Sequence, residues 1–390
     1  MKNIDLLFKT NNFKNFNKIR LNGNTLHINI IPKEELFTGV EISKIIHLIN
    51  FIHKKYGKLK FTIEFNFNKI QFIDKLTYVF LECICYYLIK TYHHPVQIYM
   101  NVIQDIRTAG IISSPLLLLN GTKLSSIEKF PNRFQFDIYR YHYRRLIKCP
   151  ENEKSNYLGK LYEEIDRFLK PFSIDDECRD EVSLVVTELV GNACEHAITD
   201  CLIDIDVVPD VKKRNENDEI DENFFYGINI AVLNFSEKLL GDDIKLNIIH
   251  NTQFPLNERY KKIFEAYDYH EQKFDDCYII EDFCNITTFQ SKISGRKSKF
   301  NTGGTGLPML IKSLADKSDT YRCYVISGKR CINFYNKNLE YDKDGWIGFN
   351  NDNNYFSDIP NDQVVNECLI YMPGTAYNFN FIMKGEQIYE

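Results

Sequence analysis

The chain has 390 residues, of which 44% are hydrophobic and 26% are charged, so it is long enough to bury two independent cores. Its formal net charge of -5 excludes a general attraction to nucleic acid, although local basic patches leave such a partner open. Eleven cysteines without a Cys-x-x-Cys spacing argue against a zinc site and for reduced thiols in a cytoplasmic protein. No apolar run is long enough to predict a membrane span.

The first 120 residues alternate between strand and helix patterns. Strands are expected at Thr25 to Ile31, Leu59 to Phe67 and Val96 to Val102, and helices at Val40 to Tyr56 and Leu76 to Tyr92. This alternation predicts a small α/β layer domain over residues 1–120.

Residues 121–150 are expected to link this domain to the rest of the chain. They carry a dense group of aromatic and basic side chains, namely Tyr139, Arg140, Tyr141, Tyr143, Arg144 and Arg145. Such a group could stack bases and bind phosphates. The acidic balance of the whole chain favours the alternative, in which it forms a seam between two domains.

Residues 181–197 predict a strongly amphipathic helix with an acid and an amide one turn apart. Glu188 and Asn192 lie off the apolar stripe and project from nearly the same face. The Glu188 carboxylate could polarise a water molecule, and the Asn192 amide oxygen could bind Mg²⁺. The alternative is an ordinary solvated edge of the helix.

A glycine-rich segment about a hundred residues later predicts a phosphate site. Gly303, Gly304 and Gly306 flank Thr305, and glycine lacks the Cβ atom that would hold the backbone away from an anion. A helix is expected from Leu307 to about Lys317, and its first N–H groups would point at the phosphates. A flexible loop is the alternative explanation of such a short motif.

Together these two motifs resemble the N box and the second glycine box of the GHKL superfamily. The matching stretches are Glu-Leu-Val-Gly-Asn-Ala-Cys-Glu-His-Ala at 188–197 and Gly-Gly-Thr-Gly-Leu-Pro-Met-Leu at 303–310. The superfamily comprises gyrase-type, chaperone, histidine-kinase and MutL-type ATPases, and this form is most similar to anti-sigma-factor serine kinases. The resemblance covers roughly residues 150–385. It implies that Glu188 orients or deprotonates the attacking water or hydroxyl, that Asn192 holds Mg²⁺, and that the backbone of residues 303–306, with Leu307, binds the phosphates of ATP.

The same resemblance implies a base-recognition residue at the end of the strand expected at Gly227 to Leu233. The family has an Asp there, whereas this chain has Asn234, whose amide can donate as well as accept. Preference for ATP over GTP is therefore left open. Thr375, after Pro373-Gly374, matches a Thr that assists base binding in many members. Ordinary turn roles are the alternative for both Asn234 and Thr375.

The stretch from about 237 to 302 corresponds to the ATP lid, which is long here. Helical apolar spacing between Phe254 and Phe274 predicts that the lid has packed structure of its own. Arg296 stands in a basic run just before the glycines and could contact phosphates, although such a short charge run favours a solvated basic loop. The polar stretches 210–223 and 337–362 predict surface loops.

The step from a strand through Phe72-Ile73-Asp74 into a helix is similar to that of STAS domains, the partners of anti-sigma-factor kinases. Phosphorylated STAS proteins have a Ser or Thr directly after this Asp. Here Lys75 and Leu76 follow, and Thr77 is the nearest hydroxyl. A phosphoacceptor role for this domain is therefore not expected.

We expect an α+β protein: a STAS-like N-terminal domain, a linker at 121–150, and a GHKL-type (Bergerat) two-layer sandwich over 151–390 with a mixed, mainly antiparallel sheet. The predicted function is Mg²⁺-dependent ATP binding and hydrolysis, in which lid ordering switches contacts with a protein partner or within a homodimer. Two alternatives remain. One is a serine/threonine kinase that acts on a partner protein, and the other is an interaction module that binds nucleotide without turnover.

Overall fold

A computed structural model of the chain describes most of the sequence. The described residues are 1–11, 21–57, 59–121, 124–149, 156–211, 223–249, 258–293, 306–317 and 322–386. Helices and strands alternate in the first part and two separate sheets are present, so the α+β class expected from the sequence is confirmed. Within the described ranges, no helix combines the length and the apolar character needed to cross a bilayer.

The N-terminal sheet is built around one long central strand, β4 (Thr62–Phe72). β2 (Thr25–Asn29) and the short β3 (Leu36–Phe37) pair with it in parallel near opposite ends, and β5 (Val96–Val102) pairs in parallel along its other edge. β1 (Leu21–Asn22) adds an antiparallel edge to β2. The sheet is therefore mixed, and β5 has the bounds expected from its apolar alternation.

Three helices cover one face of this sheet: α1 (Leu6–Lys9), α2 (Gly39–Tyr56) and α3 (Lys75–Lys90). A capping box between Thr38 and Glu41 begins α2. The Asp74 carboxylate begins α3 by accepting from the Thr77 amide at 2.9 Å. Nearly every α3 residue is buried, because this helix is apolar on all sides and packs between the N-terminal sheet and a second sheet.

The second sheet has six strands in the order β10-β11-β9-β8-β7-β6. Their bounds are β6 Phe136–Tyr139, β7 His142–Ile147, β8 Cys201–Val208, β9 Phe225–Asn234, β10 Tyr324–Asn333 and β11 Val365–Lys384. Every described pair in it is antiparallel. Mixed pairing, which the sequence predicted for this half, occurs instead in the N-terminal sheet.

The stretch assigned to a linker, 121–150, differs from that prediction. It contains the short helices α4 (Leu124–Ile127) and α5 (Phe130–Gln135) and then the hairpin of β6 and β7. β7 pairs with β8 along its whole length and so belongs to the six-stranded sheet. The sequence favoured a seam between two domains for this aromatic and basic group, and Arg144 is fully buried against acids on α3 and β8.

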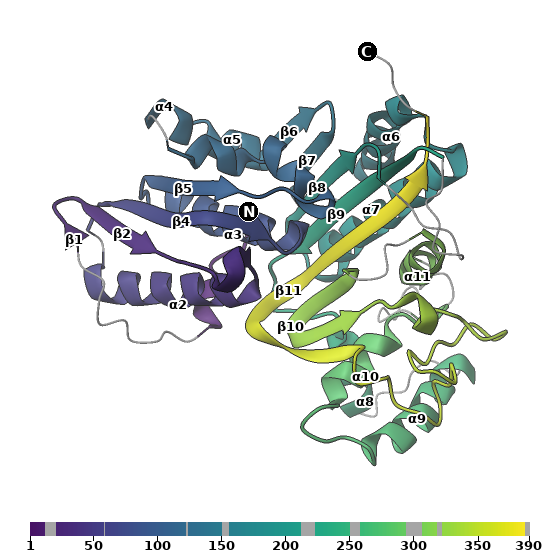
Figure 1. Cartoon of the computed structure of the whole chain (residues 1–390). Coiled ribbons are helices and arrows are strands. Elements are labelled where there is room, and N and C mark those ends of the chain that lie inside the picture. Colours follow the sequence, from purple (N-terminus) through teal and green to yellow (C-terminus); the bar gives the residue numbers. More distant parts are fainter. Residues whose placement is uncertain are drawn as a thin grey trace.

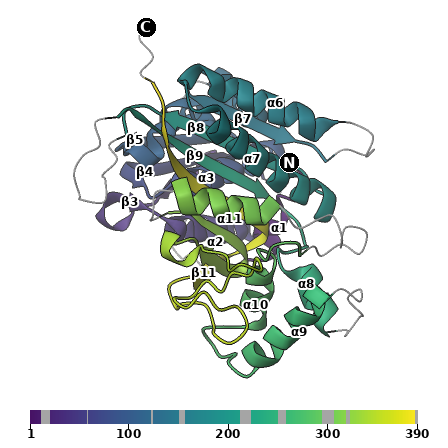
Figure 2. The ribbon, with the colours of Figure 1, turned by 90° about the vertical axis from the view of Figure 1, so that its right-hand side faces the viewer.

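The two faces of the six-stranded sheet carry different layers (Figures 1 and 2). On one face lie α6 (Tyr157–Leu169), α7 (Asp176–His196) and α11 (Gly306–Lys317). Along β9, Ile230 and Val232 face these helices, whereas Ala231 and Leu233 face the N-terminal half. The N-terminal half therefore packs against the back of the sheet whose front carries α7 and α11.

A third body of structure is formed by two segments, one between β9 and β10 and one between β10 and β11 in the sequence. It consists of α8 (Asp242–Ile249), α9 (Glu258–Glu271) and α10 (Ile280–Thr287), together with the irregular stretch 334–364. That stretch was expected to be mainly a polar surface loop, yet it carries the fully buried Trp346. The Arg259 guanidinium of α9 lies 4.1 Å from the Trp346 ring. α9 and the stretch 334–364 thus pack on each other.

His53 of α2 is held among aromatic rings in the N-terminal half. Its ring stacks on Tyr92 at a centroid distance of 3.6 Å and lies 6.3 Å from the ring of His94. Burial and the neighbouring His94 lower the pKa of His53 from 6.5 to about 4. The folded state therefore favours the neutral His53 ring. The lowered pKa of His53 contributes to the free energy of unfolding above pH 6.5, and this contribution is lost as the pH falls toward 4.

Replacing His53 by Phe should make stability less sensitive to acid. We expect the free energy of unfolding, measured with urea at pH 7 and at pH 5, to fall less in His53→Phe than in the unmodified chain. His27→Gln is the control, because His27 lies on the exposed face of β2 beside Glu64. Equal acid sensitivity in His53→Phe and the unmodified chain would contradict this assignment.

Candidate functional site

The two predicted motifs meet where α7 and α11 cross the front of the sheet. A Cβ atom added to Gly306, the first residue of α11, would lie 2.6 Å from Oε2 and 2.9 Å from Cβ of Glu188. These separations are far below a normal van der Waals contact. Gly306 therefore lets the start of α11 touch the acidic side chain of α7, and no larger residue fits there without movement.

α7 positions Glu188 and Asn192 through its own sequence. The Asp175 carboxylate caps the helix by accepting from the Glu177 amide at 2.9 Å, and the apolar stripe of the helix packs on the sheet. Glu188 is exposed and Asn192 is half-buried one turn later. Neither side chain is hydrogen-bonded to another described residue, so both remain available to a ligand.

Asn234 and Thr375, the two residues predicted to recognise a base, are direct cross-strand neighbours. Thr375 of β11 pairs with Asn234, the last residue of β9, and Asn234 pairs in turn with Cys201 of β8. The side chains of Asn234 and Thr375 are buried, with exposed fractions of 6% and 9%. Strand alternation places them on the face that carries α7 and α11, the same face as Val232 and Tyr377.

Several short contacts hold the backbone around Asn234 in place. Gly374 has a φ of +91°, and a Cβ there would lie 2.4 Å from the Asn234 carbonyl oxygen, so this position requires glycine. The Ser327 hydroxyl on β10 donates to the Gly374 carbonyl at 2.7 Å and accepts from the Leu240 amide at 3.0 Å. Ser327 of β10 thus joins Gly374 of β11 to the segment that follows β9.

An ion cluster connects the end of α7 to the first lid helix. His196 lies 3.6 Å from the Asp243 carboxylate of α8, and the Lys238 ammonium approaches the same carboxylate to 2.7 Å. Burial alone would raise the pKa of Asp243, but hydrogen bonds from His196 and Lys238 hold it below its usual value. His196 therefore links the helix that carries Glu188 to the lid.

Other predicted residues fall outside this geometry. Gly303, Gly304, Thr305 and Arg296 lie outside the described residues, as does the rest of the stretch 294–305. Leu307 is described, and its side chain packs against the core. A Cβ on Gly241, which directly precedes α8, would lie 2.8 Å from Cys284 of α10, so Gly241 allows close packing between these helices.

A cavity of about 800 Å³ lies along the α7–α11 contact and reaches the end of it that lies away from Gly306. It is lined by the N-terminal part of α7, by α11 and by residues between 336 and 345, including Glu181, Lys312 and Tyr341. Lys317 pairs with Glu181 at this end, whereas Glu188 meets Gly306 at the other. None of Glu188, Gly306, Asn234 and Thr375 is among the described residues that line the cavity, but its lining reaches Leu184, one turn before Glu188, and Pro308, two residues after Gly306.

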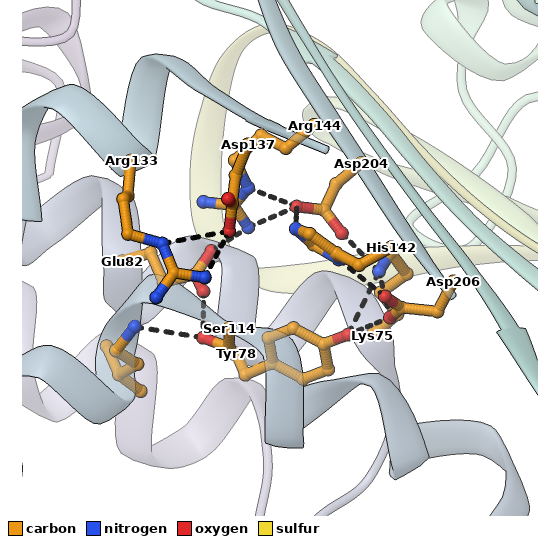
Figure 3. A network of polar contacts seen from close by, with 11 residues as sticks. Lys75, Tyr78, Glu82, Ser114, Arg133, Asp137, His142, Arg144, Asp204 and Asp206 are labelled. Carbon is orange, nitrogen blue, oxygen red and sulfur yellow. Dashed lines mark hydrogen bonds and ion pairs between the residues drawn. The ribbon is translucent and has the colours of Figure 1, made fainter. Parts of the chain in front are cut away.

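A buried polar network on the back of the sheet was not predicted (Figure 3). Lys75, at the start of α3, contacts both Asp204 and Asp206 of β8. Asp206 also accepts from the Tyr78 hydroxyl at 2.5 Å and lies 2.7 Å from Nδ1 of His142. All five side chains are buried, so the network joins the N-terminal half to the sheet without contact with solvent.

A second part of the same network is centred on Arg144. Its guanidinium contacts Asp204 and also Glu82 of α3, and Glu82 accepts from the Ser114 hydroxyl. Burial raises the pKa of Glu82 despite the nearby Arg144. Burial would also raise the pKa of Asp206, but the Lys75 ammonium and His142 hold it well below its usual range.

His142, Asp204 and Asp206 have the donor atoms of a metal site, since these atoms lie within 4.8 Å of one another. The Lys75 ammonium nevertheless contacts both carboxylates and supplies the positive charge that a cation would bring. We therefore assign the triad a structural role between the two halves. The sequence contains one signal of this network, because Asp204 and Asp206 alternate with apolar residues in β8. Every residue of that strand is buried in the structure.

No family model, no curated protein and no solved structure matches this chain. Interpretation of the site therefore rests on its residues and their geometry.

Proposed function

We propose that the chain binds ATP with Mg²⁺ and hydrolyses it slowly, as a GHKL-type nucleotide switch. The observation that carries the proposal is the contact between Gly306 and Glu188. It places the N-terminus of α11, whose first residue has no side chain, beside an exposed carboxylate. A helix N-terminus binds phosphate through its free N–H groups, and a carboxylate next to it can act on the terminal phosphate. Gly306 and Glu188 are far apart in the sequence, and their contact supports a phosphate site at this place.

Each residue would have a distinct task in this reaction. Glu188 would accept a proton from the attacking water, and the Asn192 amide oxygen would help to hold Mg²⁺. The N–H groups at the start of α11 would bind phosphate oxygens. Asn234 and Thr375 lie side by side at the buried strand ends, where they would bind the base. Magnesium, when bound, would neutralise charge that develops on the phosphates.

The N-terminal half would act as a STAS-like regulatory domain in this proposal. It packs on the back of the sheet whose front carries Glu188, and β8, β9 and β11 separate the two. Thr77, the hydroxyl nearest to the STAS phosphorylation position, is buried and hydrogen-bonded to Asp74 at 2.7 Å. Transfer of phosphate to Thr77 in this arrangement is therefore disfavoured, so a kinase activity would need a separate protein as acceptor.

Incubation of the full chain with γ-labelled ATP and Mg²⁺ tests the proposal. We expect the label to appear slowly as free phosphate and to depend on Mg²⁺. Label on an added or co-purified protein would instead support the kinase alternative, and saturable binding without release would support the interaction module. Absence of binding at millimolar ATP would contradict all three functions.

Asn234→Asp should change the selectivity for the base. The Asn234 amide can accept from the adenine amino group and can donate to the guanine carbonyl, whereas a carboxylate can only accept. We expect the variant to bind GTP about 10- to 100-fold more weakly, the effect of losing one such hydrogen bond, and to retain its ATP affinity. Asn366→Asp, the same change at an exposed position of β11, should alter neither affinity.

Calorimetric titration of both nucleotides into both variants would measure these affinities, with thermal melting to confirm that each variant is folded. Unchanged affinities in Asn234→Asp would show that Asn234 does not contact the base.

A further inference from the structure

Two cysteines lie on neighbouring strands where the pairing of β10 with β11 is interrupted. Cys331 pairs with Asn366 and Arg330 pairs with Glu367, after which the register jumps to Gly328 opposite Met372. Cys368 is therefore the first residue of the bulge in β11. It stands diagonally across from Cys331, because residues 366 and 368 project from the same face.

The two thiols interact with each other. A hydrogen bond between the two thiols raises the pKa of Cys331 and lowers that of Cys368, and the Cys331 thiol also lies 3.8 Å from the Asn333 amide oxygen, to which it can donate. Lys329 and Arg330 add positive charge nearby, and the Lys329 ammonium lies 3.3 Å from the carbonyl oxygen of Cys368. Both cysteines are only partly buried. One sulfur thus has thiolate character and the other has a proton to give, an arrangement favourable for oxidation.

Another close pair of cysteines in the chain lacks these properties. The Cys149 thiol donates to the Cys194 carbonyl oxygen at 3.3 Å, but Cys194 is buried and burial raises its pKa to about 12. Cys277 is exposed, and no other cysteine is recorded as its partner among the described residues. The Cys149–Cys194 pair therefore tests whether proximity of two cysteines is enough for oxidation, and Cys277 tests whether exposure is enough.

We propose that Cys331 and Cys368 form a redox-responsive pair, in which Cys368 reacts with a peroxide and Cys331 then closes a reversible disulfide. In the first step the Cys368 thiolate attacks one peroxide oxygen, the O–O bond breaks, and the departing hydroxide takes a proton to become water. In the second step Cys331 loses its proton and attacks the Cys368 sulfur, which releases the hydroxyl as a second water. Two thiols and one hydrogen peroxide thus give one disulfide and two waters.

The position of the pair connects this chemistry to the contact between the two halves. Burial and the Asp74 carboxylate, to which the Tyr324 hydroxyl of β10 donates at 2.8 Å, raise the pKa of Tyr324, and both cysteines lie near enough to add to this effect. Asp74 caps α3, so the disulfide would fix the irregular part of the sheet beside this contact. The inference does not depend on the proposed nucleotide function.

Peptide mapping of the oxidised full-length protein tests the proposal. The reduced chain is treated with equimolar hydrogen peroxide under native conditions, blocked with N-ethylmaleimide, digested and analysed by mass spectrometry. We expect a cross-linked peptide that joins Cys331 to Cys368, lighter by two hydrogen atoms than the free peptides and absent after treatment with a dithiol. Alkylation of both residues while Cys277 or the Cys149–Cys194 pair is oxidised first would overturn the proposal.

Single variants test the order of the steps. In Cys331→Ser the serine hydroxyl can still donate to Cys368, but no thiol can close the bond, so dimedone should trap a sulfenic acid at Cys368. Cys149→Ser should leave formation of the Cys331–Cys368 cross-link unchanged. Failure of dimedone to label Cys368 in Cys331→Ser, with labelling at another cysteine instead, would contradict the assignment of Cys368 as the reacting thiol. The map of the unmodified chain decides the matter if a variant does not fold.

Discussion

Lys75→Met should destabilise the protein by about 3–5 kcal/mol, the loss typical of removing one member of a buried ion network. Lys75 contacts Asp204 and Asp206 where all three side chains are fully buried. Without the ammonium, the two carboxylates face each other in a medium that solvates them poorly. Urea denaturation followed by tryptophan fluorescence and by circular dichroism would measure the change in the free energy of unfolding.

A matched control separates the buried charge from lysine in general. Lys69 on β4 pairs with Glu35 at 3.0 Å, but both side chains are about half exposed, so Lys69→Met should cost less than about 1 kcal/mol. Adding Asp206→Asn to Lys75→Met should restore part of the stability, because it removes one of the unpaired charges. A loss in Lys75→Met as small as that in Lys69→Met would contradict the structural role of the network.

Glu188→Gln should lower ATP turnover by about 10²- to 10⁴-fold, the usual contribution of a general base. The amide keeps the size of the side chain and its contact with Gly306, but it cannot accept the proton of the attacking water. Affinity for ATP with Mg²⁺ should therefore change little. Release of labelled phosphate at saturating ATP, together with a binding titration, would measure turnover and affinity separately.

Glu177→Gln is the matched control for this variant. Glu177 is exposed on the same helix, eleven residues earlier, which is about three turns or roughly 16 Å along nearly the same face. It should retain full turnover. Equal turnover in Glu188→Gln and the unmodified chain would remove Glu188 from the reaction, whereas a loss of binding as well would assign it a role in holding the ligand.

Local patterns predicted the helices and strands well because their signals are contained in short windows of sequence. The capping residues and apolar spacing of α2 and α3 place those helices within a residue or two of their predicted bounds. Val96–Val102 forms a strand with the bounds that its alternation indicated. The contact between Gly306 and Glu188 was expected from the two motifs taken together. Neither motif alone indicates which segment it contacts.

Features that depend on distant partners could not be predicted in the same way. The sequence does not show which acids Arg144 and Lys75 contact, and only the fold places them beside Glu82, Asp204 and Asp206. The polar composition of 337–362 likewise concealed Trp346, whose burial depends on α9.

Hydrogen–deuterium exchange with a non-hydrolysable ATP analogue and Mg²⁺ tests the central claim most directly, because it locates the bound nucleotide. The account predicts slower exchange in the second half of α7 around Glu188, at the start of α11, and at the paired strand ends that hold Asn234 and Thr375. Saturable binding with protection confined to the cavity near Glu181 and Tyr341, and none at these segments, would contradict it.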